Sequence, residues 1–187
     1  MDRHREFEWR AGRFKDVVLY VAEQLADDPT FGSTKLNKIL YFTDTEAYKR
    51  LGEPITGAIY QRNLRGPTAV EYLPMIRELE REQYVEVQSE KIVDHEQDRV
   101  TPTGRVVPNM EQFSQEERAI IDEVVSEFRG YTNTEASDES HKRSAGWIAR
   151  KQGESIPAGM VHAPVDYWDG ITPQNRRLCP TAAMEGA

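Results

Sequence analysis

One run of residues, 35–44, constrains the fold more than any other part of the chain. Its sequence is Lys-Leu-Asn-Lys-Ile-Leu-Tyr-Phe-Thr-Asp, and its apolar side chains recur at intervals of three and four residues. This spacing is typical of an amphipathic helix that packs one stripe of side chains against a core. The stripe consists of Leu36, Ile39, Leu40, Thr43 and Ala47. The polar residues that we expect to face outward are Lys35, Lys38, Glu46 and Lys49.

Helix-forming patterns recur along the chain and predict four more helices. They cover residues 11–26, 73–82, 115–128 and 133–143. Ser114 and Thr132 each precede a glutamate by three residues, which is the pattern of a capping box at the start of a helix. The helix that contains residues 35–44 is expected to be capped by Ser33 or Thr34 and to end at Gly52.

Strand patterns predict a small antiparallel sheet. Residues 58–64 alternate as a short strand does, and residues 65–67, Arg-Gly-Pro, are expected to form a turn. Residues 84–88 and 98–102 are typical of two strands of a hairpin, joined by a charged loop near residue 94. A helix followed by a hairpin is a winged-helix-like arrangement.

These patterns together predict the fold class and the domain organisation. We expect an α+β fold that is mainly α, made of a helical domain with a small antiparallel sheet or hairpin, in a winged-helix-like order. A single domain is expected over residues 1–169. Residues 170–187 are polar and weakly patterned, so we expect a loose C-terminal tail there.

Composition and charge restrict the class of protein. The 187 residues carry a formal net charge of −8, which argues against indiscriminate binding to nucleic acid, because that binding depends on Lys and Arg. Cys179 is the only cysteine, so an internal disulfide and a multi-thiolate zinc site are excluded. The first residues lack a signal-peptide pattern, and no run of residues is apolar enough to span a membrane. We expect a cytoplasmic protein with no membrane partner.

The residue types that usually carry catalysis do not form a recognisable set. The histidines, at positions 4, 95, 141 and 162, lack the spacing of a helical zinc site, and no glycine-rich phosphate loop is present. Ser137, Asp138, Ser140 and His141 are neighbours in sequence. One helix directs such neighbours differently, so they do not assemble a nucleophile, a base and an orienting group. We therefore expect no enzymatic activity, no metal and no cofactor.

Three motifs follow one another along the chain. The first is the start of the helix described above, residues 35–42. The second consists of Tyr60, Arg62, Gly66 and Pro67. The third consists of Ser140, His141, Trp147 and the run Gly-Glu-Ser-Ile-Pro at residues 153–157. In this order and spacing, they resemble the motifs of the Panacea family, the SocA-like domain of antitoxins from bacteria and phages. The resemblance covers about residues 10–168.

The resemblance implies a function in protein binding. Panacea domains are adaptors that bind and inhibit a toxin encoded beside them, so we expect the antitoxin of a toxin-antitoxin system, which neutralises its cognate toxin by direct protein–protein binding. An acidic antitoxin suits a toxin with a basic cleft, because complementary charge accelerates encounter. Homo-oligomerisation stays open. The residues expected to bind the partner are Lys35, Lys38, Tyr41, Tyr60, Arg62, Arg65, Gly66, Pro67, His141 and Trp147.

Two other functions stay open at the level of sequence. One is a proteolytic adaptor that presents a toxin to a protease. The other is a DNA-binding transcriptional regulator of the winged-helix type, with operator DNA as its partner. Its phosphate-facing strip would consist of Arg62, Arg65, Arg77 and Arg81. Four glutamates in the same stretch oppose DNA binding, namely Glu71, Glu78, Glu80 and Glu82.

The motif residues also have a purely structural interpretation. Gly66 and Pro67 suffice for a backbone turn, and Trp147 suffices to close a core. A structural hydrogen bond is favoured for His141 over catalysis or metal binding. The motifs therefore predict a scaffold more directly than they predict an active site.

Overall fold

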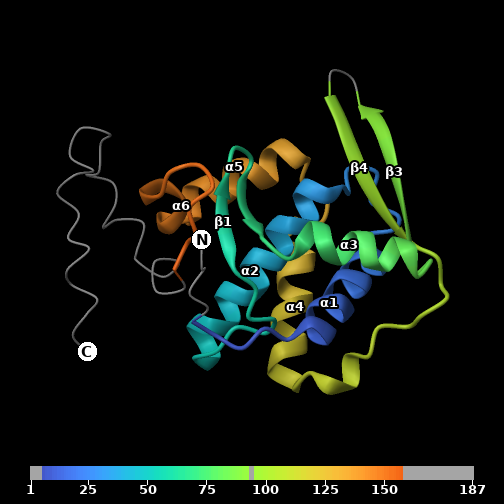
Figure 1. Ribbon diagram of the computed structural model, residues 1–187, viewed down its shortest axis with the longest axis horizontal. Helices are drawn as coiled ribbons and strands as arrows, with labels where there is room; N and C mark the ends of the chain where they lie inside the picture. The colour runs from blue at the N-terminus through green and yellow to red at the C-terminus, as the bar shows by residue number, and fades with distance from the viewer. Residues whose placement is uncertain (1–5, 93–94, 158–187) are drawn as a thin grey trace.

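Helix α2 (Ser33–Leu51) runs through the middle of the fold. The computed structural model describes residues 6–92 and 95–157, and it shows α2 surrounded by other elements (Figure 1). The elements packed against it are α1 (Ala11–Gln24), α4 (Gln115–Phe128), α5 (Asn133–Arg143), β2 (Gly66–Ala69) and β4 (His95–Pro102). The expected tail at residues 170–187 lies outside the described residues, as do His4, Asp94, His162 and Cys179.

The predicted helix ends are largely confirmed. Ser114 and Thr132 each form a complete capping box, at the starts of α4 and α5. Gly52 ends α2 in the left-handed conformation that favours glycine. The expected cap at the start of α2 is wrong, because extended Gly32 precedes the helix and Ser33 is its first residue. The Ser33 hydroxyl instead donates to the carbonyl of Asp98, at 2.9 Å.

Two antiparallel hairpins make up the strand content of the described residues. Strand β1 (Tyr60–Asn63) pairs with β2, and β3 (Val85–Ile92) pairs with β4. The second hairpin was expected and is longer than predicted. It follows α3 (Tyr72–Arg81) in the expected winged-helix-like order and projects from the body of the domain (Figure 1). The mainly α fold with small antiparallel sheets is therefore confirmed.

The first hairpin corrects the expectation of a turn at residues 65–67. The turn lies one position earlier, at Leu64 and Arg65, and Gly66 and Pro67 begin strand β2. Asn63 pairs with Gly66 and Arg62 with Pro67. A Gly-Pro pair is typical of turns, and its tolerance in a strand here reflects the end position of β2 in a sheet of two strands.

The remaining described elements are short. The 3-10 helix η1 (Met110–Gln112) precedes α4, and helix α6 (Ala145–Ala149) follows α5. Neither was predicted. The Ser144 hydroxyl accepts a hydrogen bond from Trp147 N at the start of α6. Pro74 lies in the first turn of α3, where a missing amide hydrogen breaks no intrahelical bond.

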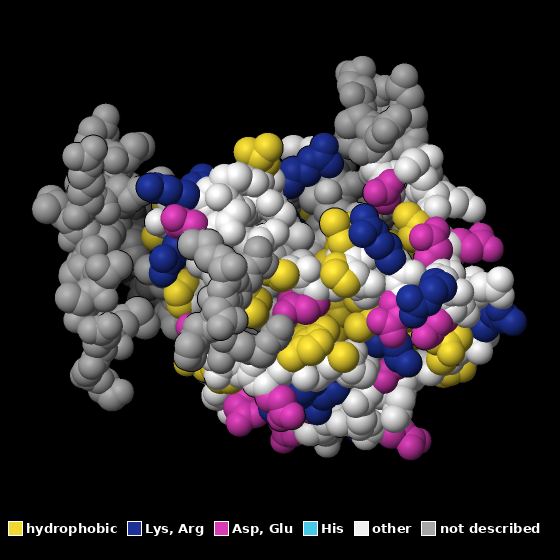
Figure 2. Space-filling model, in the orientation of Figure 1, with side chains coloured by type: hydrophobic (Ala, Val, Ile, Leu, Met, Phe, Trp, Pro, Cys, Tyr) yellow, Lys and Arg dark blue, Asp and Glu magenta, His cyan; other side chains and the backbone are white. Residues whose placement is uncertain are grey.

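The face that carries α3 has no single sign of charge. Figure 2 shows Lys and Arg side chains interspersed with Asp and Glu side chains on this face, with small groups of hydrophobic side chains among them. The exposed charged residues of α3 itself are Arg77, Glu78, Glu80 and Arg81. Adjacent charges of opposite sign weaken attraction to a phosphate backbone.

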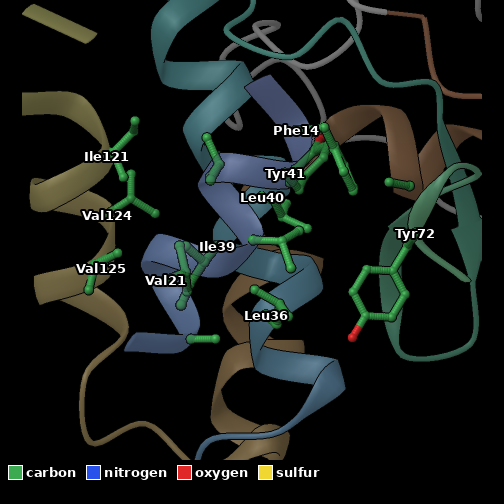
Figure 3. Packing of buried hydrophobic residues seen from close by; sticks show 14 of the residues in the cluster. Phe14, Val21, Leu36, Ile39, Leu40, Tyr41, Tyr72, Ile121, Val124 and Val125 are labelled. Carbon is green, nitrogen blue, oxygen red and sulfur yellow. The ribbon is translucent and has the colours of Figure 1, made fainter. Parts of the chain in front are cut away.

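Side chains from α1, α2 and α4 meet in the core. Figure 3 shows Ile121, Val124 and Val125 of α4 on one side and Tyr72 of α3 on another side of the residues from α2. All of these side chains are buried, and Phe14 and Val21 of α1 complete the labelled set. The stripe predicted for α2 is confirmed, since Leu36, Ile39 and Leu40 lie in this core.

Helix α2 is nevertheless buried on more than one face. Every residue from Lys35 to Thr45 is buried, which contradicts the expectation that Lys35 and Lys38 face outward. Their exposures are 0% and 1%. Glu46 is half-buried and Lys49 is exposed, closer to expectation. A periodic stripe reveals one packed face, and the lysines are buried because other elements cover the opposite face as well.

Lys35 is tolerated inside the fold because it forms an ion pair with Asp28. Its Nζ donates to Asp28 Oδ2 at 2.8 Å and to Thr30 Oγ1 at 2.7 Å. Asp28 also accepts from the backbone N–H of Gly130, at 3.0 Å. Burial alone would raise the pKa of Asp28, but the hydrogen bonds from Lys35, Thr30 and Gly130 hold it well below its usual range. This cluster joins the connector before α2 to the connector before α5.

We expect Lys35→Met to destabilise the protein strongly, because it leaves the buried Asp28 carboxylate without its cation. Breaking a buried ion pair from one side costs about 3–5 kcal/mol. The measurement is the free energy of unfolding by chemical denaturation. Lys49→Met on the exposed part of the same helix is the control, with an expected change within about 0.5 kcal/mol. Equal stabilities of the two variants would contradict a stabilising role for the pair.

Candidate functional site

The β1–β2 hairpin is attached to α2 through a buried lysine. Lys38 Nζ donates to the carbonyl of Pro67, at 2.8 Å. Gly66 allows this approach, because a Cβ there would lie 2.8 Å from Lys38 Cε and still closer to Ser140 Oγ. Its φ of 100° also favours glycine. The Gly-Pro motif is therefore the point where the hairpin contacts α2 and α5.

Two tyrosines connect α2 to the elements around it. The hydroxyls of Tyr41 and Ser144 form a hydrogen bond of 2.7 Å, which joins α2 to the start of α6. The hydroxyl of Tyr60 lies 2.9 Å from the carbonyl oxygen of Leu40 and 3.0 Å from Asp44 Oδ2, and its one hydrogen is shared between these two acceptors. These bonds satisfy hydroxyls that burial would otherwise leave unpaired.

Asp44 is a buried carboxylate that the sequence analysis did not single out. It accepts from the N–H of Thr56 at 2.7 Å and from the hydroxyls of Thr56 and Tyr60. Burial raises its pKa to about 6, although these hydrogen bonds oppose the change. Its place on the apolar side of α2, four residues after Leu40, is the sequence signal that would have indicated its burial.

Three motif residues form a stack beside β1. The rings of His141 and Trp147 are stacked, with centroids 3.8 Å apart, and the guanidinium of Arg62 lies 4.5 Å from the centroid of the Trp147 ring. Trp147 Nε1 donates to the carbonyl of Asn63 at 2.8 Å, and Arg62 donates to the carbonyl of Arg150. The stack thus joins β1, α5 and α6 at a partly exposed position.

The third motif continues along the outer edge of β1. The N–H of Arg62 donates to the carbonyl of Glu154, and the N–H of Gly153 donates to the carbonyl of Arg62. Ile156 N–H donates to the carbonyl of Tyr60, and Gln61 pairs with Ser155 in an antiparallel bridge. Residues 153–156 therefore lie beside β1 as a short third strand would.

The ten residues predicted to bind a partner differ in how exposed they are. All except Lys35 lie around the β1–β2 hairpin, while Lys35 belongs to the separate cluster with Asp28. Six are buried, namely Lys35, Lys38, Tyr41, Tyr60, Gly66 and Pro67. Three are partly exposed, namely Arg62, His141 and Trp147. Arg65 alone among the ten is exposed.

A hollow with a volume of about 330 Å³ lies beside the turn of the hairpin. We call it the turn pocket. It is lined by Ser33, Thr34, Asn37, Lys38, Asn63, Leu64, Arg65, Thr68 and Gln152. Most of these residues were not predicted, because they come together only when the hairpin packs on α2. Leu64 is 82% exposed because it lies in the turn of the hairpin. Placing the predicted turn at residues 64–65 would have predicted the exposure of its side chain.

Lys38 has a pKa below that of an ordinary lysine. Burial, with the nearby positive charge of Arg65 as a smaller cause, lowers its pKa to about 7. Burial also lowers the pKa of His141, and the charge of Lys38 contributes to that change. Loss of solvation disfavours the charged form of both groups.

Ser140 and His141, two of the neighbouring residues at positions 137–141, make contacts within the fold. Ser140 Oγ donates to the carbonyl of Ser137, and the ring of His141 is stacked on Trp147. Within residues 6–92 and 95–157, no group of three or more His, Cys, Asp or Glu side chains is placed to hold a metal ion. No helix in the same part of the chain is long and apolar enough to cross a membrane.

The pKa of Lys38 predicts a pH-dependent stability. The unfolded lysine, with an ordinary pKa of 10.5, binds more protons than the folded one between pH 7 and 10.5. The contribution of Lys38 to the free energy of unfolding should therefore increase as the pH rises through this range. Denaturation of wild type and Lys38→Met across the range measures it, with Lys49→Met as the control. A constant difference between wild type and Lys38→Met would contradict the lowered pKa.

The comparisons with known proteins agree with the motif analysis. The family model described as antitoxin SocA-like, Panacea domain, matches residues 36–148, which is more than half of the chain. The matched range includes nine of the ten predicted residues and begins just after Lys35. The expected domain over residues 1–169 is wider and stays a prediction. Neither a curated protein nor a solved structure matches the chain. The chain belongs to the SocA-like antitoxin family with the Panacea domain.

Proposed function

We propose that this protein neutralises a cognate toxin by direct binding, and that the turn of the β1–β2 hairpin is the centre of the contact surface. The observation that carries the proposal is Leu64, a large apolar side chain that is 82% exposed at the tip of a firmly anchored hairpin. An exposed apolar side chain beside a cation, here Arg65, suits the centre of a protein interface.

The anchoring of the hairpin supports this choice. The bond from Lys38 to Pro67 holds β2 on α2, and Trp147 holds the end of β1 through the carbonyl of Asn63. Residues 153–156 cover the outer edge of β1. A tip held from several sides loses little conformational entropy when a partner binds. The family motifs thus act indirectly, by positioning Leu64 and Arg65.

The stack of Arg62, Trp147 and His141 extends the proposed surface. Arginine and aromatic side chains are enriched at the residues that dominate binding energy. These three are already in contact with one another, so their geometry is set before a partner arrives. At longer range, the net charge of −8 accelerates encounter with a basic toxin. The proposed mechanism is occlusion of the toxin, with no chemical step and no cofactor.

Co-expression with the product of the neighbouring gene tests the proposal. Growth is scored first, and the two proteins are then co-purified. Rescue of growth together with a stable complex is the expected result. Rescue without a complex would favour the proteolytic adaptor instead. A neighbour that is harmless when expressed alone would contradict the antitoxin function.

Substitutions at the hairpin turn test the contact surface. We expect Leu64→Glu and Arg65→Glu each to weaken the complex by at least about 2 kcal/mol, as loss of a central interface residue does. Leu73→Glu on α3 is the matched control, because Leu73 is also exposed but lies on another element. Affinity is measured by titration calorimetry, and an unchanged melting temperature confirms folding. If Leu73→Glu alone disrupted the complex, the contact surface would lie at α3.

Operator DNA is the second candidate partner, because α3 is followed by a projecting hairpin. The mixed charges of α3 oppose it, and Arg62 is stacked on Trp147. Retention of the purified protein on duplex DNA across a salt series separates the two partners, since phosphate contacts give a steep salt dependence. We expect no retention at physiological salt.

A further inference from the structure

We propose that the turn pocket binds a small oxyanion group with a hydrogen-bond donor next to it, either a carboxylate beside an amide N–H or a hydrogen phosphate. The proposal concerns the chain by itself and does not depend on the identity of a toxin. It starts from the charges that line the pocket, Lys38 and Arg65.

These two cations are not balanced by acids at the pocket. Within the described residues, its lining contains no Asp and no Glu. Lys38 is 1% exposed and its ammonium donates to a neutral carbonyl, that of Pro67. A buried cation without a countercharge is costly, and an anion in the pocket would offset that cost. The arrangement contrasts with Lys35, whose charge is balanced by Asp28.

The other lining groups suit an oxyanion as well. Ser33 and Thr34 are the first residues of α2, where the helix dipole favours negative charge. Thr68 adds a hydroxyl group, which also lies 3.4 Å from the carbonyl oxygen of Gly66. Asn63 and Gln152 add amide groups that are joined to each other by a hydrogen bond of 3.1 Å. The volume of about 330 Å³ has room for a small group and its first bonded neighbours.

Asn37 restricts the chemical class of ligand that suits the turn pocket. It lines the pocket, it is 5% exposed, and its Oδ1 is buried with no hydrogen-bond partner among the described residues. Its Nδ2 donates to the carbonyl of Ser33 at 3.0 Å, which assigns the amide orientation. A buried acceptor without a hydrogen bond costs free energy, so a ligand that supplies a hydrogen-bond donor is favoured. A simple anion has none, whereas a peptide-like carboxylate and a hydrogen phosphate each have one.

Anion binding should take up a proton near neutral pH. The charged and titratable groups that act on Lys38 are Arg65 at the hairpin turn and His141 on α5. A positive charge on Arg65 or on His141 favours the neutral amine form of Lys38. A bound anion would favour the ammonium form instead, so we expect a carboxylate, whose own charge does not change over this range, to bind more tightly at pH 6 than at pH 8.

The experiment is a titration of the full ¹⁵N-labelled chain, followed by NMR. The probes are N-acetylglycine and inorganic phosphate, each compared with sodium chloride at the same ionic strength. We expect saturable shifts confined to amides at residues 33–38, 63–68 and 152. Arg65→Gln should weaken binding about tenfold or more, which corresponds to loss of one charge-assisted hydrogen bond. Arg77→Gln, an exposed arginine on α3, is the matched control and should bind as wild type does.

The outcomes distinguish the source of the oxyanion. Saturation by N-acetylglycine alone supports a carboxylate of a polypeptide, and saturation by phosphate alone supports a phosphate group. The proposal is overturned if neither probe exceeds sodium chloride, or if Arg65→Gln and Arg77→Gln bind equally well. Because no toxin is present, failure here leaves the antitoxin proposal untouched.

Discussion

Burial of α2 on several faces is the constraint on which the rest of the structure depends. A helix in this position has little solvent to satisfy its polar side chains, so its two buried lysines and its buried tyrosine bond to groups inside the protein. The charge of Lys35 is balanced by Asp28, and the ammonium of Lys38 donates a hydrogen bond to the carbonyl of Pro67. Tyr41 is satisfied by Ser144. Each partner belongs to a different segment of the chain, so satisfying α2 also fixes where those segments lie.

This arrangement separates residues that hold the structure from residues that are exposed at the hairpin turn. Most family motif residues near the hairpin are buried or bonded to backbone, and their effect is to hold the β1–β2 turn in place. The turn itself carries Leu64 and Arg65, which make few of these internal bonds. A scaffold of this design allows the exposed tip to change without loss of the fold, because surface substitutions usually alter stability little.

Local sequence signals were sufficient to predict much of the helical structure. The capping boxes at Ser114 and Thr132 and the glycine at position 52 predicted three helix ends, because capping depends on atoms within a few residues. The β1–β2 hairpin was missed because a Gly-Pro pair favours a turn, and only contact with Lys38 and Ser140 shows why it begins a strand. The turn pocket was missed because its lining comes from three distant segments.

The sequence by itself determined the mainly α class, the helix–hairpin order and the family, because periodicity, capping and ordered motifs are local or linear properties. Only the tertiary structure decided which motif residues are accessible. Lys38 has the same chemistry as any exposed lysine on a helix, and its burial follows from strand β2 and helix α5 packing over it. Such packing joins residues about thirty to one hundred positions apart, and a pattern within one helix carries no record of it.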